Sequence, residues 1–172
     1  MTVNRFIWLP FLLVPLCGVA AEAHVHGMAT LQIAVDGKTL QLNLESPLDS
    51  LLGFEHQPRT NQQKIAVKDM EHRLRQAGQL FKPTPAANCT LKSVALISPV
   101  LETGKDHGHQ HDDHANLDGE FIFECAKPTE LRDLEVILFD SFPRLRQLKA
   151  EAATPRGQTA VTLTPARRKV SW

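Results

Sequence analysis

Two short runs of alternating apolar and polar residues, joined by a turn dipeptide, constrain the fold of this chain more than any other feature. In residues 31–35 and again in residues 40–45, every second side chain is leucine, isoleucine or valine. A period of two is typical of a strand that buries one face. The dipeptide Asp36-Gly37 between the runs is a strong signal for a hairpin turn. Residues 28–46 are therefore predicted to form a β-hairpin, and Ser46-Pro47 ends its second strand.

One helix is predicted after the hairpin. Asn61 is a plausible N-cap for a helix that runs to Ala77 and is ended by Gly78. Its expected inner face is marked by Ile65, Val67 or Lys68, Leu74 and Ala77. Residues 48–58, before this helix, are expected to form a loop or a short helix, and residues 80–88, after it, an irregular segment.

The second half of the chain predicts mainly strands. We expect strands at about 90–97, 119–125, 133–139 and 159–164, and a strand or short helix at 145–152. Residues of about 98–118 form a long loop between the first two of these strands, and a loop of that length is usually functional or disordered. The predicted fold class is α+β: mainly an antiparallel sheet or a sandwich, with one principal helix and this long loop.

The N-terminal segment has the features of an export signal. Arg5 is followed by an uncharged apolar stretch, residues 6–19, that is short for a membrane span and contains two prolines. Ala21-Glu22-Ala23 matches the small-x-small pattern cleaved by signal peptidase, with Val19-Ala20-Ala21 as an alternative. We therefore expect a signal peptide at residues 1–23 and an exported single domain at residues 24–172, whose first residue is His24.

Two cysteines, Cys89 and Cys125, belong to the expected mature chain. In an oxidising compartment such a pair predicts a disulfide. Cys89 opens one predicted strand and Cys125 closes the next, so the two would face each other in an antiparallel pair. The alternative is a pair of unlinked buried thiols.

The long loop carries the most concentrated chemistry in the chain. Residues 106–114 contain four histidines and three aspartates and, up to residue 113, no apolar side chain. Neutral imidazole is the commonest protein ligand for zinc and similar metals, and carboxylates add oxygen ligands and negative potential. The tract therefore predicts metal binding, with a solvated acidic loop as the alternative. The candidate ligands are His107, His109, His111 and His114.

A second histidine group is expected at one end of the hairpin. His24 and His26 lie two residues apart just before the first strand, so in an extended chain both imidazoles project to one side. Glu55 and His56 lie in the segment that follows the second strand, at the same end. These four side chains predict an ordered site with nitrogen and oxygen ligands, as zinc favours. The alternatives are a frayed terminus for His24 and His26 and a hydrogen-bonded loop histidine for His56. His72, in mid-helix, is expected to be a surface residue.

A set of motifs follows in order along the chain: residues 24–27, 36–37, 45–47 and 53–58, the cysteine pair, the histidine-rich loop, and residues 138–139 and 142–143. This set resembles that of the zinc-regulated periplasmic accessory proteins of Gram-negative bacteria (ZrgA-like). Gly-Phe-Glu-His is the most specific of these motifs, and the resemblance covers essentially the whole mature chain. It implies a non-enzymatic periplasmic protein that binds zinc and assists zinc acquisition by passing the metal to an import system of the periplasm or inner membrane. The tract is short for this family, which argues against high-capacity storage.

Other functions are less consistent with the sequence. A copper or nickel carrier of the same architecture stays an alternative, because nitrogen ligands bind copper more tightly than zinc. A copper oxidoreductase with an N-terminal histidine is a further alternative, although such enzymes usually present aromatic groups and this chain has no tyrosine. Lysines and arginines equal aspartates and glutamates at 19 each, so no basic surplus indicates nucleic acid. No segment of the mature chain predicts stable membrane insertion.

Overall fold

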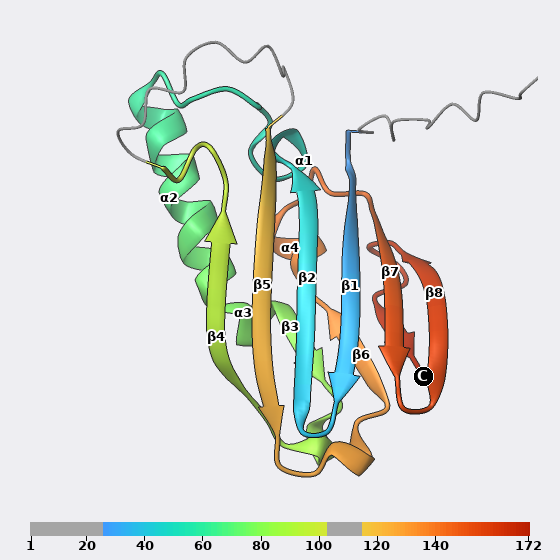
Figure 1. Cartoon of the computed structure of the whole chain (residues 1–172). Helices are drawn as coiled ribbons and strands as arrows, with labels where there is room; N and C mark the ends of the chain where they lie inside the picture. The colour runs from blue at the N-terminus through green and yellow to red at the C-terminus, as the bar shows by residue number, and fades with distance from the viewer. Residues whose placement is uncertain (1–25, 103–114) are drawn as a thin grey trace, which may run out of the picture.

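A computed structural model of the chain describes residues 26–102 and 115–172. Its described part consists of a six-stranded and a three-stranded sheet, one 15-residue helix and several shorter helices (Figure 1). The six-stranded sheet has the spatial order β4 (Cys89–Ile97), β5 (Asn116–Cys125), β2 (Thr39–Pro47), β1 (Met28–Asp36), β7 (Gln147–Thr154) and β8 (Gly157–Leu163). The smaller sheet has the order β3 (Phe81–Pro83), β6 (Asp133–Val136) and β9 (Lys169–Ser171). The helices are α1 (Leu48–Leu52), α2 (Asn61–Arg75), α3 (Ala77–Leu80) and α4 (Leu138–Ser141), with 3-10 turns η1 (Pro85–Ala87) and η2 (Pro128–Glu130). The predicted α+β class is confirmed.

The predicted hairpin is confirmed as β1 and β2. The strands pair antiparallel from Thr30↔Glu45 to Asp36↔Thr39, and Gly37 in the turn has a φ of 55°. Each strand buries every second side chain, as the alternation predicted. The pairing of β1 with β7 is parallel, in a sheet whose other strand pairs are antiparallel.

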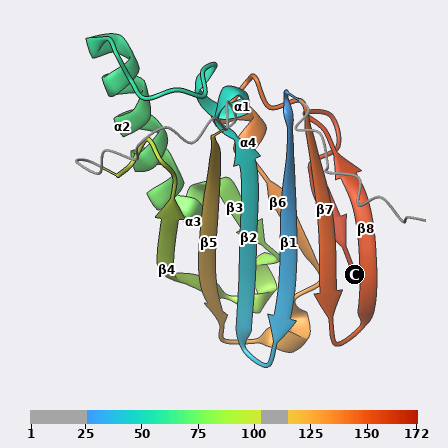
Figure 2. The ribbon, with the colours of Figure 1, turned by 45° about the horizontal axis from the view of Figure 1, so that its top comes forward.

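The core lies between the two sheets. Figures 1 and 2 show β3 and β6 behind the six-stranded sheet, so that one of its faces is covered. Phe81 from β3 and Phe121 from β5 meet across this layer with ring centroids 5.0 Å apart. Leu31 from β1 and Leu42 from β2 are fully buried beside them. Burial of these apolar side chains is the main favourable term in folding.

The principal helix, α2, differs from the prediction at both ends and on its inner face. It ends at Arg75 with Gln76 as its C-cap instead of running to Ala77, and Gly78 lies within α3 instead of ending the helix. The N-cap of α2 is Thr60 instead of Asn61, and a capping box with Gln63 satisfies two backbone N–H groups at the helix start. The buried stripe consists of Val67, Met70 and Leu74, which recur at helical spacing, and continues at Ala77 in α3. Ile65 is 59% exposed and Lys68 is exposed, because both lie off that stripe.

Four other segments correct the prediction. The expected strand at 133–139 ends at Val136 and is followed by α4, and residues 80–88 contain β3 and η1 instead of being irregular. Strand β5 begins at Asn116 and not at residue 119, because Gly119 interrupts the alternation of apolar side chains in the sequence. The ring of Phe121 fills the space that a Cβ at Gly119 would take. The C-terminal residues form β9, which pairs with β6.

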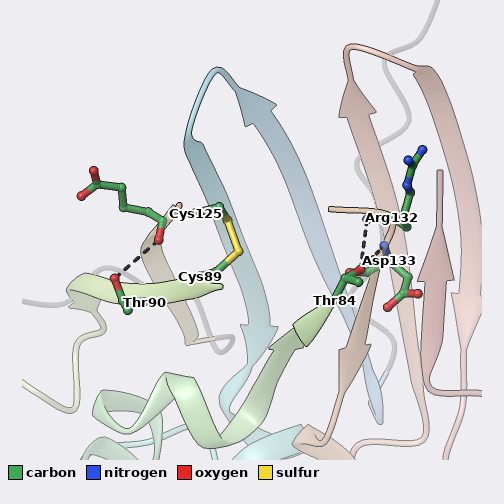
Figure 3. The surroundings of a disulfide bond; sticks show 7 residues. Thr84, Cys89, Thr90, Cys125, Arg132 and Asp133 are labelled. Carbon is green, nitrogen blue, oxygen red and sulfur yellow. Dashed lines mark hydrogen bonds between the residues drawn. A yellow bond between two sulfur atoms is a disulfide. The ribbon is translucent and has the colours of Figure 1, made fainter. Parts of the chain in front are cut away.

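The predicted disulfide joins Cys89 to Cys125 across β4 and β5, where the two residues are direct register partners (Figure 3). The Cys125 N–H donates to the carbonyl oxygen of Lys38, which places the disulfide beside the β1–β2 turn.

The opposite end of the six-stranded sheet is formed by the starts of β1, β5 and β7 and the ends of β2 and β4. We call this end, uppermost in Figure 1, the upper edge. Within the described ranges, no helix is long and apolar enough to cross a membrane.

Candidate metal centre

Backbone hydrogen bonds fix the start of β1 at the upper edge. The carbonyl oxygen of Gly27 accepts from the N–H groups of Arg146 (2.8 Å) and Gln147 (3.0 Å), which ties this residue to the start of β7. On its other side, the Gly27 N–H donates to the Ser50 hydroxyl of α1 at 3.0 Å. Gly27 has a φ of 80°, a conformation that favours glycine. The backbone directly after His26 is therefore fixed by hydrogen bonds on both sides, while the side chain of His26 is exposed.

One nitrogen of the His26 imidazole faces two carboxylates. This nitrogen, Nδ1, is 3.1 Å from Oδ2 of Asp49 and 4.0 Å from Oε1 of Glu55. The side chain of His26 is 64% exposed, whereas those of Asp49 and Glu55 are 27% and 13% exposed. A cation can therefore approach the imidazole from solvent, while the two carboxylates below it supply negative potential and oxygen ligands.

The short helix α1 sets the positions of both carboxylates. It follows directly from the end of β2, with Pro47 as its N-cap, so Asp49 lies in its first turn. Its C-cap is Gly53 in the left-handed conformation, at a φ of 83°, and the Gly53 N–H donates to the carbonyl oxygen of Asp49 at 2.9 Å. The guanidinium of Arg144 lies against Gly53, where a Cβ would be 2.6 Å from its Nε. After this turn the chain leads directly into Glu55.

His56 makes contacts of another kind. Its Nδ1 is 2.8 Å from the carbonyl oxygen of Gln57, and its ring lies 5.2 Å from that of Phe54. A carbonyl oxygen can only accept, so Nδ1 must carry the proton of a neutral ring. This leaves Nε2 as the free lone pair. Metal-ligating histidines commonly show this arrangement, in which a backbone oxygen holds the nitrogen that does not bind metal.

The ends of the histidine-rich loop are bound to the same edge. The N–H of Leu48, at the start of α1, donates to the carbonyl oxygen of Ala115 at 2.9 Å. At the other end of the loop, Gln57 donates from Nε2 to the carbonyl oxygen of Pro99 at 2.6 Å. His24 and the tract histidines lie outside the described residues: His107, His109, His111 and His114.

His26, Asp49 and Glu55 form a partial site. Among residues 26–102 and 115–172, no group of three or more histidine, cysteine, aspartate or glutamate side chains is assembled closely enough to hold a metal ion. Nδ1 of His26 lies 4.0 Å from Oε1 of Glu55 at this edge. His72 is exposed on α2, as expected, with its Nε2 2.8 Å from Nε2 of Gln76.

Asp49 was missed by the sequence-based prediction. It is an acidic residue in the first turn of a five-residue helix, which is a common position for a negative charge. Only the folded hairpin, which places the end of β2 beside the start of β1, brings Asp49 to His26. Its position next to the Glu-Ser-Pro segment was the one available signal.

Comparison with known proteins adds one finding. A protein-family model described as ZrgA family zinc uptake protein matches residues 23–172, which includes every described residue of the partial site. A search of curated proteins found no match.

Proposed function

Since this chain belongs to the ZrgA family of zinc uptake proteins, a family that is not an enzyme family, we propose that it is a periplasmic carrier that captures zinc and passes it to an import system. The observation that carries this proposal is the His26 imidazole held 3.1 Å from Asp49 and 4.0 Å from Glu55 at the upper edge. Imidazole nitrogen and carboxylate oxygen are both ordinary zinc ligands.

The first part of the proposal is an ordered site at the start of β1. His26 and Asp49 would bind zinc together with Glu55, His56 and His24, which precedes His26 by two residues. Zinc prefers four ligands, and this group of five side chains can supply four without a cysteine. The exposure of His26 and the lack of a preassembled cluster among the described residues suit a cargo that must leave again.

The second part of the proposal concerns the histidine-rich tract. His107, His109, His111 and His114 would capture zinc weakly, because their segment contains no apolar side chain from Asp106 to Asp113 that could order it by packing. The support for cooperation with the ordered site is the attachment of Ala115 to Leu48, the residue before Asp49. Zinc bound by the tract would then have a short path to the ordered site.

The proposed location rests on two features. A disulfide is expected in an oxidising compartment, and Cys89–Cys125 is a cross-strand disulfide of the core sheet. Residues 1–23 have the composition of a signal peptide, and the family match begins at residue 23. We propose that the single metal-binding domain, residues 24–172, acts in the periplasm after cleavage.

The proposal is tested by the metal content of the protein isolated from its native periplasm, followed by competition titration with zinc, copper and nickel. Zinc should be the metal recovered, and zinc should be transferred to a chelator that mimics an acceptor. Recovery of copper or nickel would instead favour a carrier for that metal. A strain that lacks the protein should take up less zinc when zinc is scarce, and normal uptake would contradict the proposed role.

A further inference from the structure

The fully buried polar side chains of the described residues gather at the upper edge. Among residues 26–102 and 115–172, three polar or charged residues are buried: Ser46 (0% exposed), Ser50 (0%) and Ser98 (2%). Ser46 lies at the end of β2, Ser50 in α1 and Ser98 just after β4. A buried hydroxyl is tolerated where it makes hydrogen bonds, so each of these serines must satisfy a specific group.

Ser50 differs from the other two in the group that it binds. Its Oγ accepts from the N–H of Gly27 at 3.0 Å and donates to the carbonyl oxygen of Met28 at 3.4 Å. These are the two residues that follow His26. Ser46 donates to the carbonyl oxygen of Pro47, its own neighbour, at 3.2 Å. Ser98 donates to the carbonyl oxygen of Asn116 at 2.9 Å.

Two consecutive residues of α1 therefore hold the chain around the start of β1, residues 26–28, in two ways. We call this segment, with the residues before it, the N-terminal arm. Ser50 binds the backbone of the arm, and Asp49 contacts the imidazole of His26. Gly27 itself is buried and closely packed, because Arg144 and Arg146 lie within 3.4 Å of a Cβ built there. Without the Ser50 hydroxyl, the buried N–H would lose its acceptor, and that loss favours displacement of the arm.

We propose that Ser50 is a positioning residue for zinc at His26: it holds the Gly27–Met28 backbone so that the imidazole stays beside Asp49. This inference rests on the proposed function, because it names the residue that orders the proposed zinc site. Ser50 does not contact the metal. Its effect passes through the arm, in the way that a hydrogen bond to the residue behind a metal ligand keeps that ligand oriented.

The test compares three matched substitutions in the mature chain by competition titration with zinc. Ser50→Ala should raise the dissociation constant of the tightest zinc by about tenfold or more, the usual effect of removing a hydrogen bond that orients a metal ligand. Ser46→Ala and Ser98→Ala each remove a buried hydroxyl at the same edge without touching Gly27, and should leave that constant unchanged. The melting temperature of all three variants measures the purely structural cost.

A double-mutant cycle separates positioning from a general structural effect. In a His24→Ala/His26→Ala background, Ser50→Ala should weaken zinc binding no further, because the arm then has no imidazole to position. A full additional loss in that background would overturn the inference. So would a Ser50→Ala variant that binds zinc as tightly as the wild type while His26→Ala binds weakly. If His26→Ala itself binds zinc normally, the proposed site fails and not only the role of Ser50.

A measurement on the wild-type chain covers the case in which Ser50→Ala does not fold. Zinc binding and arm docking are linked, so zinc should slow hydrogen exchange of the Gly27 amide, which donates to Ser50. Exchange of the Cys125 amide, which donates to the carbonyl oxygen of Lys38 at the opposite end of the sheet, is the internal control. Equal exchange of the Gly27 amide with and without zinc would overturn the positioning role.

Discussion

Nδ1 of His26 lies 3.1 Å from Oδ2 of Asp49, although one residue precedes β1 and the other follows β2. The β1–β2 hairpin makes this contact possible, because its pairing returns the chain to the edge from which it started. The result is an imidazole and a carboxylate at one exposed point of a rigid sheet. Sites built on such elements hold their ligands more accurately than sites built on loops alone.

Deletion of residues 106–114 should separate the two proposed zinc-binding parts. We expect the variant to lose the weakly bound zinc and keep the tightest site and the unfolding free energy. The reason is that Leu48 and Gln57 bind the loop at Ala115 and Pro99, both outside the deleted segment. Zinc stoichiometry and denaturant unfolding measure both quantities. Loss of all zinc binding would contradict a separate ordered site.

Replacement of both cysteines by serine should lower stability without lowering zinc affinity. The disulfide closes a sequence separation of 36 residues, for which a cost of roughly 2–4 kcal/mol is typical. It lies beside the β1–β2 turn, at the far end of the sheet from His26. Denaturant unfolding and zinc titration of the same samples provide the check. A non-reduced digest of the wild-type chain should contain the Cys89 and Cys125 peptides linked; free thiols in periplasmic material would refute the disulfide.

The parts of the fold that the sequence predicted are those set by neighbouring residues. The β1–β2 hairpin follows from local alternation and Asp36-Gly37. Cys89 faces Cys125 because Cys89 begins one strand of an antiparallel pair and Cys125 ends the other. Strand β9 could not be recognised, because three residues with one buried side chain, Val170, carry no periodic signal. Asn61 was predicted as the N-cap in place of Thr60, since either residue type can cap a helix. The capping box between Thr60 and Gln63 is what makes Thr60 the N-cap.

The candidate site was predicted only in part, for a related reason. His26 and Glu55 were recognisable because their residue types are metal ligands at the two ends of a predicted hairpin. Asp49 and Ser50 were not, because their roles depend on where α1 packs against the N-terminal arm. The parallel pairing of β1 with β7 also joins distant segments, and it leaves no local pattern.

Gly53→Ala should weaken zinc binding, whereas Gly37→Ala should not. Both glycines have positive φ, 83° and 55°, so alanine at either position costs roughly 1–2 kcal/mol in backbone strain. At Gly53 the new Cβ would in addition push the Arg144 guanidinium aside, whereas at Gly37 it meets no atom within 4 Å. Gly53 ends α1 beside Asp49, while Gly37 lies in the turn at the opposite end of the hairpin. Unfolding free energies should therefore fall for both variants. Equal zinc affinities in the two would indicate that α1 does not order the site.

Asp140→Asn should reduce stability at neutral pH but not at strongly acidic pH. Asp140 makes a two-pronged ion pair with Arg168, at 2.6 and 2.8 Å, and the hydrogen bond from this guanidinium is the main reason that the pKa of Asp140 is lowered. Because its pKa is lower in the folded state, the ionised carboxylate stabilises the fold at neutral pH. That contribution is lost as the pH falls through the folded pKa.

Melting temperatures of this variant and the wild type, measured against pH, should therefore converge at low pH. Asp69→Asn, on the exposed side of α2, is the control and should show a much smaller difference at neutral pH. A difference for Asp140→Asn that stays constant with pH would exclude the ion pair as its cause.

The most direct measurement of the proposed zinc site is a competition titration of the mature chain with zinc, in which His26→Ala is compared with His72→Ala. His26 contacts Asp49 and Glu55 at the upper edge, whereas His72 is an exposed histidine of α2. We predict that His26→Ala raises the dissociation constant of the tightest zinc at least about tenfold, and that His72→Ala leaves it unchanged. A His26→Ala chain that binds its tightest zinc as the wild type does would contradict the account.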